Sequence, residues 1–539
     1  MGGTDQPGIA ARSGRRILEL VLAGLMLACG GGGNGDGGGG TIIIGMRDDF
    51  SGLNPVTNSS FYTDQIIKYA LFTPLIGYDE SFNPRPHLAE SWEMHGDTAV
   101  TLRLRQDVRW HDGQPVTAED VKFTFDRAKA PETASLIGSA YLGSVDSAEV
   151  LDAYTIRFAF TEPHAQAIED FWWAPVPRHL LEGTAPSAMA NAPFNRNPVG
   201  SGPFRFGEWR ANDRLVLVRN DEFPEALGGP PAAQRAVFRV IPEPATILTE
   251  LITGGIHVDI PLEPDQTDRI EGSDQLTLHS FPGNTLYYLG WNNARPPFDD
   301  VAVRRAMTMA IDRQEIIDAL LSGYGTPATG TVPPWHPFHP DVEPITTDLE
   351  AAGGLLEQAG WQHRDNDGIR EDAQGRPLRF RLLTSERPLN RAIVEVVQSQ
   401  LRRVGAAVEV QVLEFQTMLA QHRNREFDAV LSNWVLDNFQ MASAPYSLFH
   451  SSQAEIAQSA NRSGVRSERL DRLIEAGAAA TDPEEARRVW REFTQAIQEE
   501  QPFTFMFWLD ELAATSNRLS GVTMDQRGEF QSLAEWSLR

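Results

Sequence analysis

Residues 99–128 read AVTLRLRQDVRWHDGQPVTAEDVKFTFDRA, and this stretch combines a strand pattern, a turn and a helix pattern. Apolar and polar side chains alternate over 99–104, which predicts a half-buried strand. The Asp-Gly pair at 112–113 is a turn signal. Thr117 followed by Asp120 three residues later is typical of a capped helix start, and apolar residues recur at helical spacing after it. The stretch therefore predicts a strand, a turn and a helix in that order.

Strands and helices of the same kind continue on both sides of this stretch. Apolar or alternating runs predict strands at 41–45, 155–160, 215–219, 238–241, 286–291 and 503–508. Amphipathic spacing predicts helices at 245–253, 301–310, 470–480 and 484–500. Helices that alternate with strands imply an α/β fold with parallel sheets covered on both faces. Residues 80–198 look antiparallel and are interpreted as an insertion of different character.

The composition excludes several classes of function. The chain has 539 residues, of which 41% are hydrophobic, so it can bury a large core. Its 73 acidic residues against 47 Lys and Arg give a net charge of -26, which disfavours nucleic acid and anionic lipid surfaces as partners. The single cysteine excludes an intrachain disulfide and a Cys-rich metal site. The HExxH, GxSxG and Walker phosphate-loop patterns are absent from the sequence.

The N-terminus has the features of a secretory signal. Three arginines precede the apolar run 17–28, which is too short to span a bilayer as a helix. We expect residues 1–28 to be a signal peptide that is removed before Cys29. The sequence Met-Leu-Ala-Cys resembles a bacterial lipobox, so Cys29 is the expected lipidation site; the alternative is an ordinary signal peptide that ends near a cysteine. Residues 29–40 would then be a lipidated, Gly-rich, flexible tether on the outer side of the membrane.

Five segments in register over the body resemble one protein family. They read LFTPLIGYDESFNPRPHLAESW (71–92, continuing into the stretch quoted above), NPVGSGPFRFGEW (197–209), LGWNNARPPFDDVAVRRAMTMAIDRQEII (289–317), FDAVLSNWVLD (427–437) and NRSGVRSERLDRLIEAG (461–477). Together they resemble the oligopeptide/dipeptide/nickel class of solute-binding proteins of ABC importers, known as bacterial extracellular solute-binding proteins of family 5. One such segment would be weak support, whereas five in order are specific. Most of their residues also have structural roles, such as turns at Gly200 and Gly202, where we expect a positive φ.

The resemblance implies a two-lobed periplasmic-binding-protein fold of type II, cluster C, with an additional β-rich domain inserted in the first lobe. Lobe I would comprise 41–79, 199–290 and 505–539, with the inserted domain at 80–198. Lobe II would comprise 291–504. The two crossover strands between the lobes are expected at 286–291 and 503–509. The ligand would lie between the lobes, whose closure excludes water and strengthens polar contacts.

The resemblance also implies a function without catalysis. The chain would be the extracytoplasmic, monomeric substrate-binding component of an ABC importer, delivering a small solute to the membrane permease. The solute would be a di- or oligopeptide, although the same scaffold also serves metal chelates, opines and sugars. No cofactor is expected. Two alternatives stay open: a secreted, lipid-anchored hydrolase, for which no nucleophile and base pattern is visible, and a binding module that feeds a sensor.

The main candidate ligand residue is Asp437, which follows Trp434 by three positions. In peptide-binding members an Asp at this spacing holds the ligand's α-ammonium, and a charge-assisted hydrogen bond of that kind is strong. Trp434 and Val435 would form part of the pocket wall. The alternatives are a helix cap for Asp437 and core packing for Trp434. The chain departs from the family pattern after Asp437, where Asn438 stands in place of an acid, and this departure puts a peptide ligand in question.

Further candidates come from three other segments. Asn54 and Phe61 belong to a loop, with Ser59 and Ser60, that borders the cleft in this family. Tyr288 and Trp291 lie at an expected crossover, where aromatic walls are common. His422 and Arg423 stand where some members meet the ligand's carboxylate. For each of these residues core packing, a structural loop or a solvated helix face is the alternative.

Metal sites are not expected. His336 and His339 lie in a Pro-rich loop that is usual for the family whatever the ligand, although imidazole binds nickel. The run Asp-Asn-Asp-Gly at 365–368 is similar to the start of a calcium loop. The acid required at the twelfth position is missing, because Arg376 stands there. A hairpin turn is the interpretation that fits.

Overall fold

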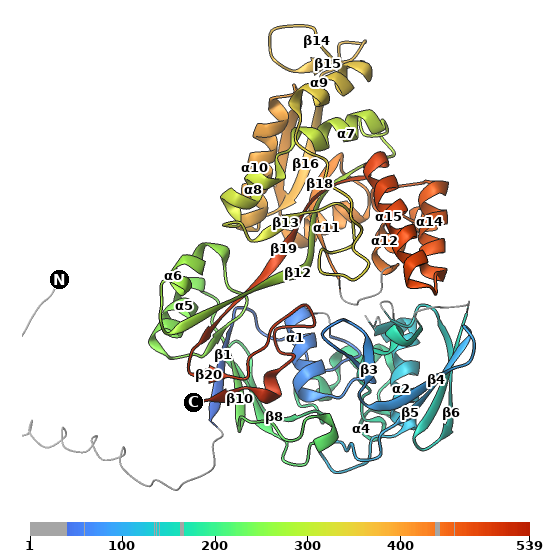
Figure 1. Ribbon diagram of the computed structural model, residues 1–539, viewed down its shortest axis with the longest axis vertical. Coiled ribbons are helices and arrows are strands. Elements are labelled where there is room, and N and C mark those ends of the chain that lie inside the picture. Colours follow the sequence, from blue (N-terminus) through green and yellow to red (C-terminus); the bar gives the residue numbers. More distant parts are fainter. Residues whose placement is uncertain are drawn as a thin grey trace, which may run out of the picture.

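The computed structural model describes residues 40–58, 60–133, 135, 137–138, 141–161, 167–436, 442–456 and 459–539. The chain forms a lower lobe that contains both the first strand and the C-terminal strand, and an upper lobe built from the later helices and strands (Figure 1). This confirms the two-lobed α/β architecture. Cys29, Ser59 and Asp437 lie outside the described residues.

Two long strands, β12 (Leu276–Trp291) and β19 (Phe503–Ser516), run between the lobes (Figure 1). They pair antiparallel along almost their whole length, with a register shift between Pro282 and Thr285. At this shift the backbones approach closely, since a Cβ on Gly283 would lie 2.4 Å from the Leu509 carbonyl oxygen. The segments 286–291 and 503–509, where the crossovers are expected, lie within these two strands.

One mixed sheet extends from the upper lobe through β12 and β19 into the lower lobe. Its strands follow in the order β17 (Ala407–Leu413), β16 (Arg379–Ser385), β18 (Ala429–Val435), β12, β19, β11 (Val258–Asp259), β1 (Thr41–Met46), β10 (Arg235–Val240), β9 (Arg214–Arg219) and β8 (Phe204–Arg210), and β13 (Gly325–Pro327) adds to β19. The strands predicted from 41, 215 and 238 onward are all present.

The main sheet is mixed, so the expectation of parallel sheets is wrong for most of its strand pairs. β1 is parallel to β10 and β11, and β16 is parallel to β17 and β18. All the other pairings of this sheet are antiparallel among the described residues. For β8 and β9 the physical reason is their short connection, because only residues 211–213 join them and a parallel pair needs a crossover of about a dozen residues or more.

The inserted segment carries its own antiparallel sheet, in the order β4 (Ala89–Met94), β5 (Ala99–Leu104), β7 (Thr155–Phe160) and β6 (Val145–Asp152). Helix α2 (Ala118–Lys129) packs on it, with Val121, Phe125 and Ala128 buried. Asp120 accepts a hydrogen bond from the backbone nitrogen of Thr117 at 2.9 Å, as the capping pattern predicts. The small strands β2 (Ile76–Tyr78) and β3 (Pro84–Pro86) form a hairpin near this sheet.

Helices cover the upper part of the sheet (Figure 1). They are α7 (Val301–Ala310), α8 (Arg313–Leu320), α9 (Leu349–Gln358), α10 (Pro388–Arg402), α11 (Phe415–Arg423), α12 (Ser443–Phe449), α13 (Ser451–Ala454), α14 (Glu468–Ala479) and α15 (Pro483–Glu500). Helix α7 begins where the sequence predicts, since the Asp300 side chain accepts from the Ala302 nitrogen. In the lower lobe lie α1 (Phe61–Ile66), α4 (Arg178–Leu181), α5 (Pro244–Thr253) and α6 (Thr267–Glu271).

Gly200 and Gly202 serve a different purpose from the one expected. Neither residue has a positive φ. Instead, a Cβ on Gly200 would lie 1.9 Å from the Leu71 carbonyl oxygen, and one on Gly202 would lie 2.4 Å from that of Ala70. The Gly202 nitrogen donates to Leu71 at 2.9 Å. Glycine is needed here because this loop packs directly on the backbone of the α1 region, which positions the site described below.

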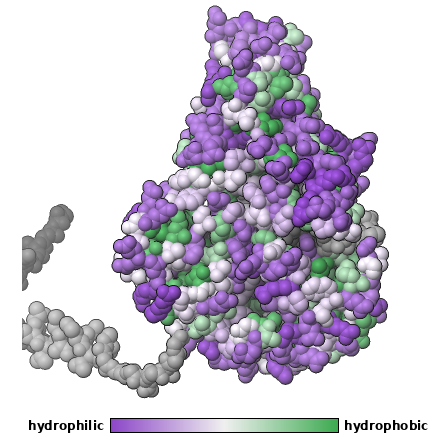
Figure 2. All heavy atoms as spheres, viewed as in Figure 1, coloured by the Kyte–Doolittle hydropathy of each residue, from purple (hydrophilic) through white to green (hydrophobic). Residues whose placement is uncertain are grey.

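The surface carries mostly hydrophilic side chains, with hydrophobic ones scattered over both lobes (Figure 2). This distribution agrees with the strongly acidic composition. In the part of the chain that the structure describes, every helix is too short or too polar to traverse a bilayer.

Candidate ligand-binding site

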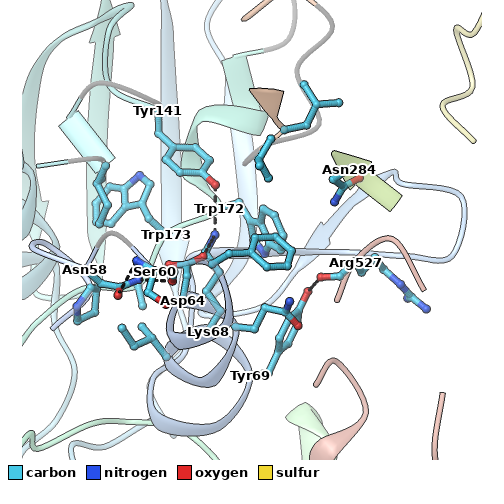
Figure 3. Close-up of a pocket in the computed structure, with 18 of the residues that line it drawn as sticks. Asn58, Ser60, Asp64, Lys68, Tyr69, Tyr141, Trp172, Trp173, Asn284 and Arg527 are labelled. Carbon is cyan, nitrogen blue, oxygen red and sulfur yellow. Dashed lines mark hydrogen bonds and ion pairs between the residues drawn. The ribbon is translucent and has the colours of Figure 1, made fainter. Parts of the chain in front are cut away.

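A cavity of about 300 Å³ lies where the lower lobe, the inserted domain and the end of β18 meet, and we call it the central cavity (Figure 3). Its volume falls at the lower end of the range of about 300–1,000 Å³ for small-molecule pockets. It is lined by Pro55, Asn58, Ser60, Phe61, Asp64, Gln65, Ile67, Lys68, Tyr69, Ile137, Tyr141, Trp172, Trp173, Ala174, Asn284, Val435, Leu436, Gln526 and Arg527.

The first wall comes from α1 and the π-helical turn Ile67–Leu71 that continues it. Asn58 fixes the start of this element, because its side chain bonds the backbone nitrogen and the carbonyl oxygen of Ser60 at 3.2 and 3.1 Å. A π-helical turn holds one more residue than an α-helical turn and is frequent at functional sites. Here the element brings Phe61 and Lys68 to the same cavity.

Lys68 is a cation enclosed by aromatic rings. Its Nζ lies 4.0 Å from the centre of the Trp172 ring and donates to the Tyr141 hydroxyl at 3.2 Å. Its charge is balanced by Asp64, whose carboxylate lies 2.7 Å away. The Lys68 side chain is only 7% exposed, whereas that of Asp64 is 38% exposed. A desolvated cation over an indole face is held more strongly than an exposed one.

The C-terminal segment closes the cavity on the side of Tyr69 (Figure 3). The Tyr69 hydroxyl donates to the Arg527 carbonyl oxygen, and burial raises the pKa of Tyr69 above its ordinary range. The Arg527 guanidinium forms an ion pair with Asp525 at 2.5 Å. These contacts tie residues near the end of the chain to the first helix.

The opposite wall comes from the crossover region. Leu436 follows β18, and its backbone nitrogen donates to the Asn284 carbonyl oxygen on β12 at 2.9 Å. The Asn284 amide nitrogen donates to the Gln526 carbonyl oxygen at 3.3 Å. The amide oxygen of Asn284 is buried and has no hydrogen-bond partner among the described residues. Because an unpaired buried acceptor is costly, this oxygen is suited to accept a hydrogen bond from a ligand.

The cavity therefore offers aromatic walls, a buried cation and an unpaired acceptor. This combination suits a small amphiphilic solute with apolar parts and N–H groups. Within the described ranges, no group of three or more His, Cys, Asp or Glu side chains could hold a metal ion. The run at 365–368 joins β14 (Gln362–His363) to β15 (Arg370–Glu371), so the expected hairpin turn is present.

Among the residues predicted from sequence, Phe61 and Val435 line the central cavity. Trp434 precedes Val435 on β18 and packs against the hydrophobic core of the upper lobe. Asn54 is fully buried beneath the loop, where it donates to the Asn195 side chain at 2.8 Å. The ligand role of Asp437 stays a prediction, because this residue lies outside the described residues.

The other candidates lie away from the central cavity. Tyr288 stacks on Phe503 at 4.2 Å, and Trp291 stacks on Phe298 at 4.5 Å, both in the upper-lobe cores. The His422 ring is buried and bonds to Arg462 at 3.2 Å, and Arg423 is exposed at the end of α11. Burial lowers the pKa of His422 well below its ordinary value, which disfavours a charged imidazole.

Sequence reasoning missed Lys68, Trp172 and Asn284. A lone lysine in the apolar helical run 65–71 was a possible signal, since a buried lysine needs a partner. The adjacent tryptophans Trp172 and Trp173 show no helical or strand periodicity, so the sequence does not tell a core residue from a pocket-wall residue at these positions. Asn284 could not be found from the sequence, because only the register shift in β12 makes its position special.

Known proteins resemble this chain over most of its length. The sequence profile described as bacterial extracellular solute-binding proteins, family 5 Middle, matches residues 83–455. The oligopeptide-binding protein AppA of Bacillus subtilis (strain 168) is 29% identical over 498 residues, which cover 89% of each chain. The dipeptide-binding protein of Escherichia coli (strain K12) is 25% identical over 516 residues, which cover 91% of this chain and 93% of the relative. The solved structure of Bacillus subtilis AppA with a nonapeptide has a TM-score of 0.78 at 27% identity and covers 93% of this chain and 99% of that one.

Proposed function

The chain belongs to the bacterial extracellular solute-binding proteins of family 5, and we propose on this premise that it is the extracytoplasmic substrate-binding component of an ABC importer for di- or oligopeptides. It would bind the peptide between its lobes and deliver it to the permease. The likeness to an oligopeptide-binding and to a dipeptide-binding relative supports this class of ligand.

The observation that carries the proposal is the central cavity, whose lining residues come from both lobes. Trp172 and Phe61 belong to the lower lobe and its insertion, whereas Val435 and Leu436 come from the end of an upper-lobe strand. A ligand in this position contacts both lobes at once. Its binding free energy would therefore favour the closed arrangement over the open one, which is the state that a permease can recognise.

The polar groups of the cavity match a peptide. The unpaired amide oxygen of Asn284 would accept from a peptide N–H or from the terminal ammonium. The aromatic walls formed by Phe61, Tyr69 and Trp172 would hold an apolar side chain. Asp437 would supply the counter-charge for the α-ammonium, next to the described end of this wall at Leu436.

The remaining sequence predictions complete the proposal. Residues 1–28 would be a signal peptide and Cys29 a lipid anchor, so that the tether 29–40 holds a monomeric body outside the cytoplasm. The division into lobe I, the insertion 80–198 and lobe II 291–504 is supported by the separate sheet of the inserted segment. The protein would leave the covalent bonds of its ligand unchanged.

Native mass spectrometry of the purified protein tests the ligand class directly, because tightly bound ligands survive purification. We expect a mass increment that fits a di- or oligopeptide, and calorimetric binding when the stripped protein receives that peptide. A sugar, an opine or a metal chelate in its place would overturn the peptide assignment. Incubation with the peptide followed by mass analysis tests the hydrolase alternative, which requires cleavage products.

A further inference from the structure

A second cavity, of about 470 Å³, lies between the inserted domain and the upper lobe, and we call it the side cavity. From below it is lined by Phe82 of the β2–β3 hairpin and by Glu169, which lies in the short helical turn Ala167–Phe171. From above it is lined by His336, Phe338 and Arg487. Like the central cavity, it has walls from both lobes.

Glu169 is the unusual residue of the side cavity. Its Oε2 atom is buried and has no hydrogen-bond partner among the described residues. Burial, and then the charge of Asp170, raise the pKa of Glu169 to about 8. A carboxyl group in such a place is costly to ionise unless a cation reaches it. Among the described residues of the inserted domain, none forms a hydrogen bond with this Oε2 atom.

Within the described ranges, the charged and titratable neighbours of Glu169 do not supply that cation. Asp170 and Tyr78 lie on the same side as Glu169; Asp170 accepts from the Ser144 hydroxyl at 2.5 Å. Across the cavity, the Arg487 guanidinium pairs with Glu484 at 2.5 Å and lies over the Phe338 ring. His336 lines the same upper wall.

The walls of the side cavity and of the central cavity are built from neighbouring segments. Glu169 lines the side cavity and Trp172 lines the central cavity, and the two are three residues apart in the sequence. The Trp172 ring packs edge-on against the Tyr78 ring, with 5.3 Å between the ring centres. On the far side, the Trp335 ring packs on Phe82 at 4.7 Å, and its Nε1 donates to the Gly283 carbonyl oxygen at 3.2 Å. Gly283 precedes Asn284 of the central cavity.

We propose that the side cavity is a subsite for a lysine or arginine side chain of the bound peptide, and that Glu169 determines this specificity. The proposal rests on the proposed function, since it assumes a peptide that reaches from the central cavity. The carboxylate would accept a charge-assisted hydrogen bond from the ammonium or guanidinium group, which is stronger than a neutral one. The rings of Phe82 and Phe338 would cover the apolar stem of the same side chain.

Calorimetry with matched peptides tests the proposal. Alanine-based tetra- to hexapeptides carry one lysine, or one norleucine, at each position in turn, and they are titrated into the full chain, into Glu169→Gln and into Glu149→Gln. Glu149 is an exposed acid on β6 of the same domain, so this variant has the same change in charge away from the cavity. Glu169→Gln places an amide of the size and polarity of the protonated carboxyl group at this position and is expected to preserve the fold.

For at least one lysine position we expect binding about tenfold or more tighter than for norleucine, as bonds to charged groups allow. Glu169→Gln removes this preference and leaves the norleucine peptides unchanged, whereas Glu149→Gln keeps it. Equal affinities of the lysine and norleucine peptides for the unmodified chain would overturn the proposal, and so would a lysine preference that survives in Glu169→Gln. If no peptide of either series binds, the proposed function itself fails.

Proton release provides a second readout that needs no variant. Because Glu169 holds its proton up to about pH 8 without ligand, binding of a lysine peptide at pH 7 releases close to one proton, and affinity rises with pH until about 8. The number of protons follows from calorimetry in two buffers of different ionisation enthalpy. If lysine and norleucine peptides release the same number of protons on binding, the result contradicts the role of Glu169.

Discussion

The Nζ atom of Lys68 lies 4.0 Å from the centre of the Trp172 ring, so a helix of the lower lobe and the inserted domain meet in one cation–π contact. The same lysine pairs with Asp64 one turn earlier on its own helix. The contact therefore does more than line the cavity, since it also joins the helical segment that carries Lys68 to Trp172 of the inserted domain. The stability of the fold and the shape of the site depend on the same side chain.

We expect Lys68→Met to lower the free energy of unfolding by about 1–2 kcal/mol, because it removes a desolvated cation–π contact and leaves Asp64 without its partner. Chemical denaturation measures the change. Lys122→Met is the matched control, because Lys122 pairs with Asp126 at the same spacing on an exposed helix face. Its effect should stay below about 0.5 kcal/mol. Equal effects of the two variants would contradict the buried role of Lys68.

Gly200→Ala should destabilise the protein by about 1–3 kcal/mol or more, since the new methyl group would lie 1.9 Å from the Leu71 carbonyl oxygen and the backbone would have to shift. Gly183→Ala serves as the control, because a Cβ there meets nothing within 4 Å. Thermal unfolding of both variants checks this close approach. A stable Gly200→Ala variant would show that the loop does not pack on the α1 region as described.

Stability should depend on pH through Asp259, a fully buried residue whose carboxylate oxygens lack partners in the described chain. Burial raises its pKa to about 7, and the charge of Arg47 opposes this rise. Between about pH 4 and 7 the unfolded chain loses the proton and the folded chain keeps it, so this carboxyl group destabilises the fold as pH rises through that window.

Asp259→Asn removes this titration. Relative to the unmodified chain, the variant should gain about 2–4 kcal/mol of unfolding free energy between pH 4 and pH 7, and the difference should stay constant above pH 7. Urea unfolding across the pH range measures it. A difference that does not change with pH would show that Asp259 has an ordinary pKa.

Asp437→Asn should weaken a ligand that carries an α-ammonium by about 1.5–3 kcal/mol, the range for a hydrogen bond to a charged group. Calorimetry with a free peptide and with its N-acetylated form separates this role from a structural one, because only the free peptide carries the charge. If the affinity for the free peptide is unchanged in the variant, Asp437 does not belong to the site.

Periodicity predicted most of the elements because each local signal agreed with the final packing. The run 99–104 is β5 and 301–310 is α7, with the bounds that the sequence indicates. The error about parallel sheets has a physical cause, because a buried strand has the same apolar pattern whether its neighbour is parallel or antiparallel. Pairing direction depends on connections, and the sequence pattern does not describe them.

The site was harder to predict than the fold. Tyr288 and Trp291 are aromatic and lie on a crossover, yet both point into cores. A strand buried on both faces shows no alternation of apolar and polar residues, so its sequence does not tell which side chains face a core and which face a cavity. Lys68 and Glu169 became visible only in three dimensions. Their importance depends on which partners surround them, and those partners come from segments far away in the sequence.

Hydrogen exchange with and without a bound peptide tests the central claim most directly, because it reports on both lobes in one experiment. The account predicts that the peptide slows exchange in residues 61–71 of the lower lobe and in residues 429–436 at the end of β18 together. The exposed residues 362–368 of the β14–β15 hairpin, which lies at the far end of the upper lobe (Figure 1), should be unaffected. Slower exchange confined to one lobe, or none at either segment with the peptide bound, would contradict a ligand gripped between two lobes.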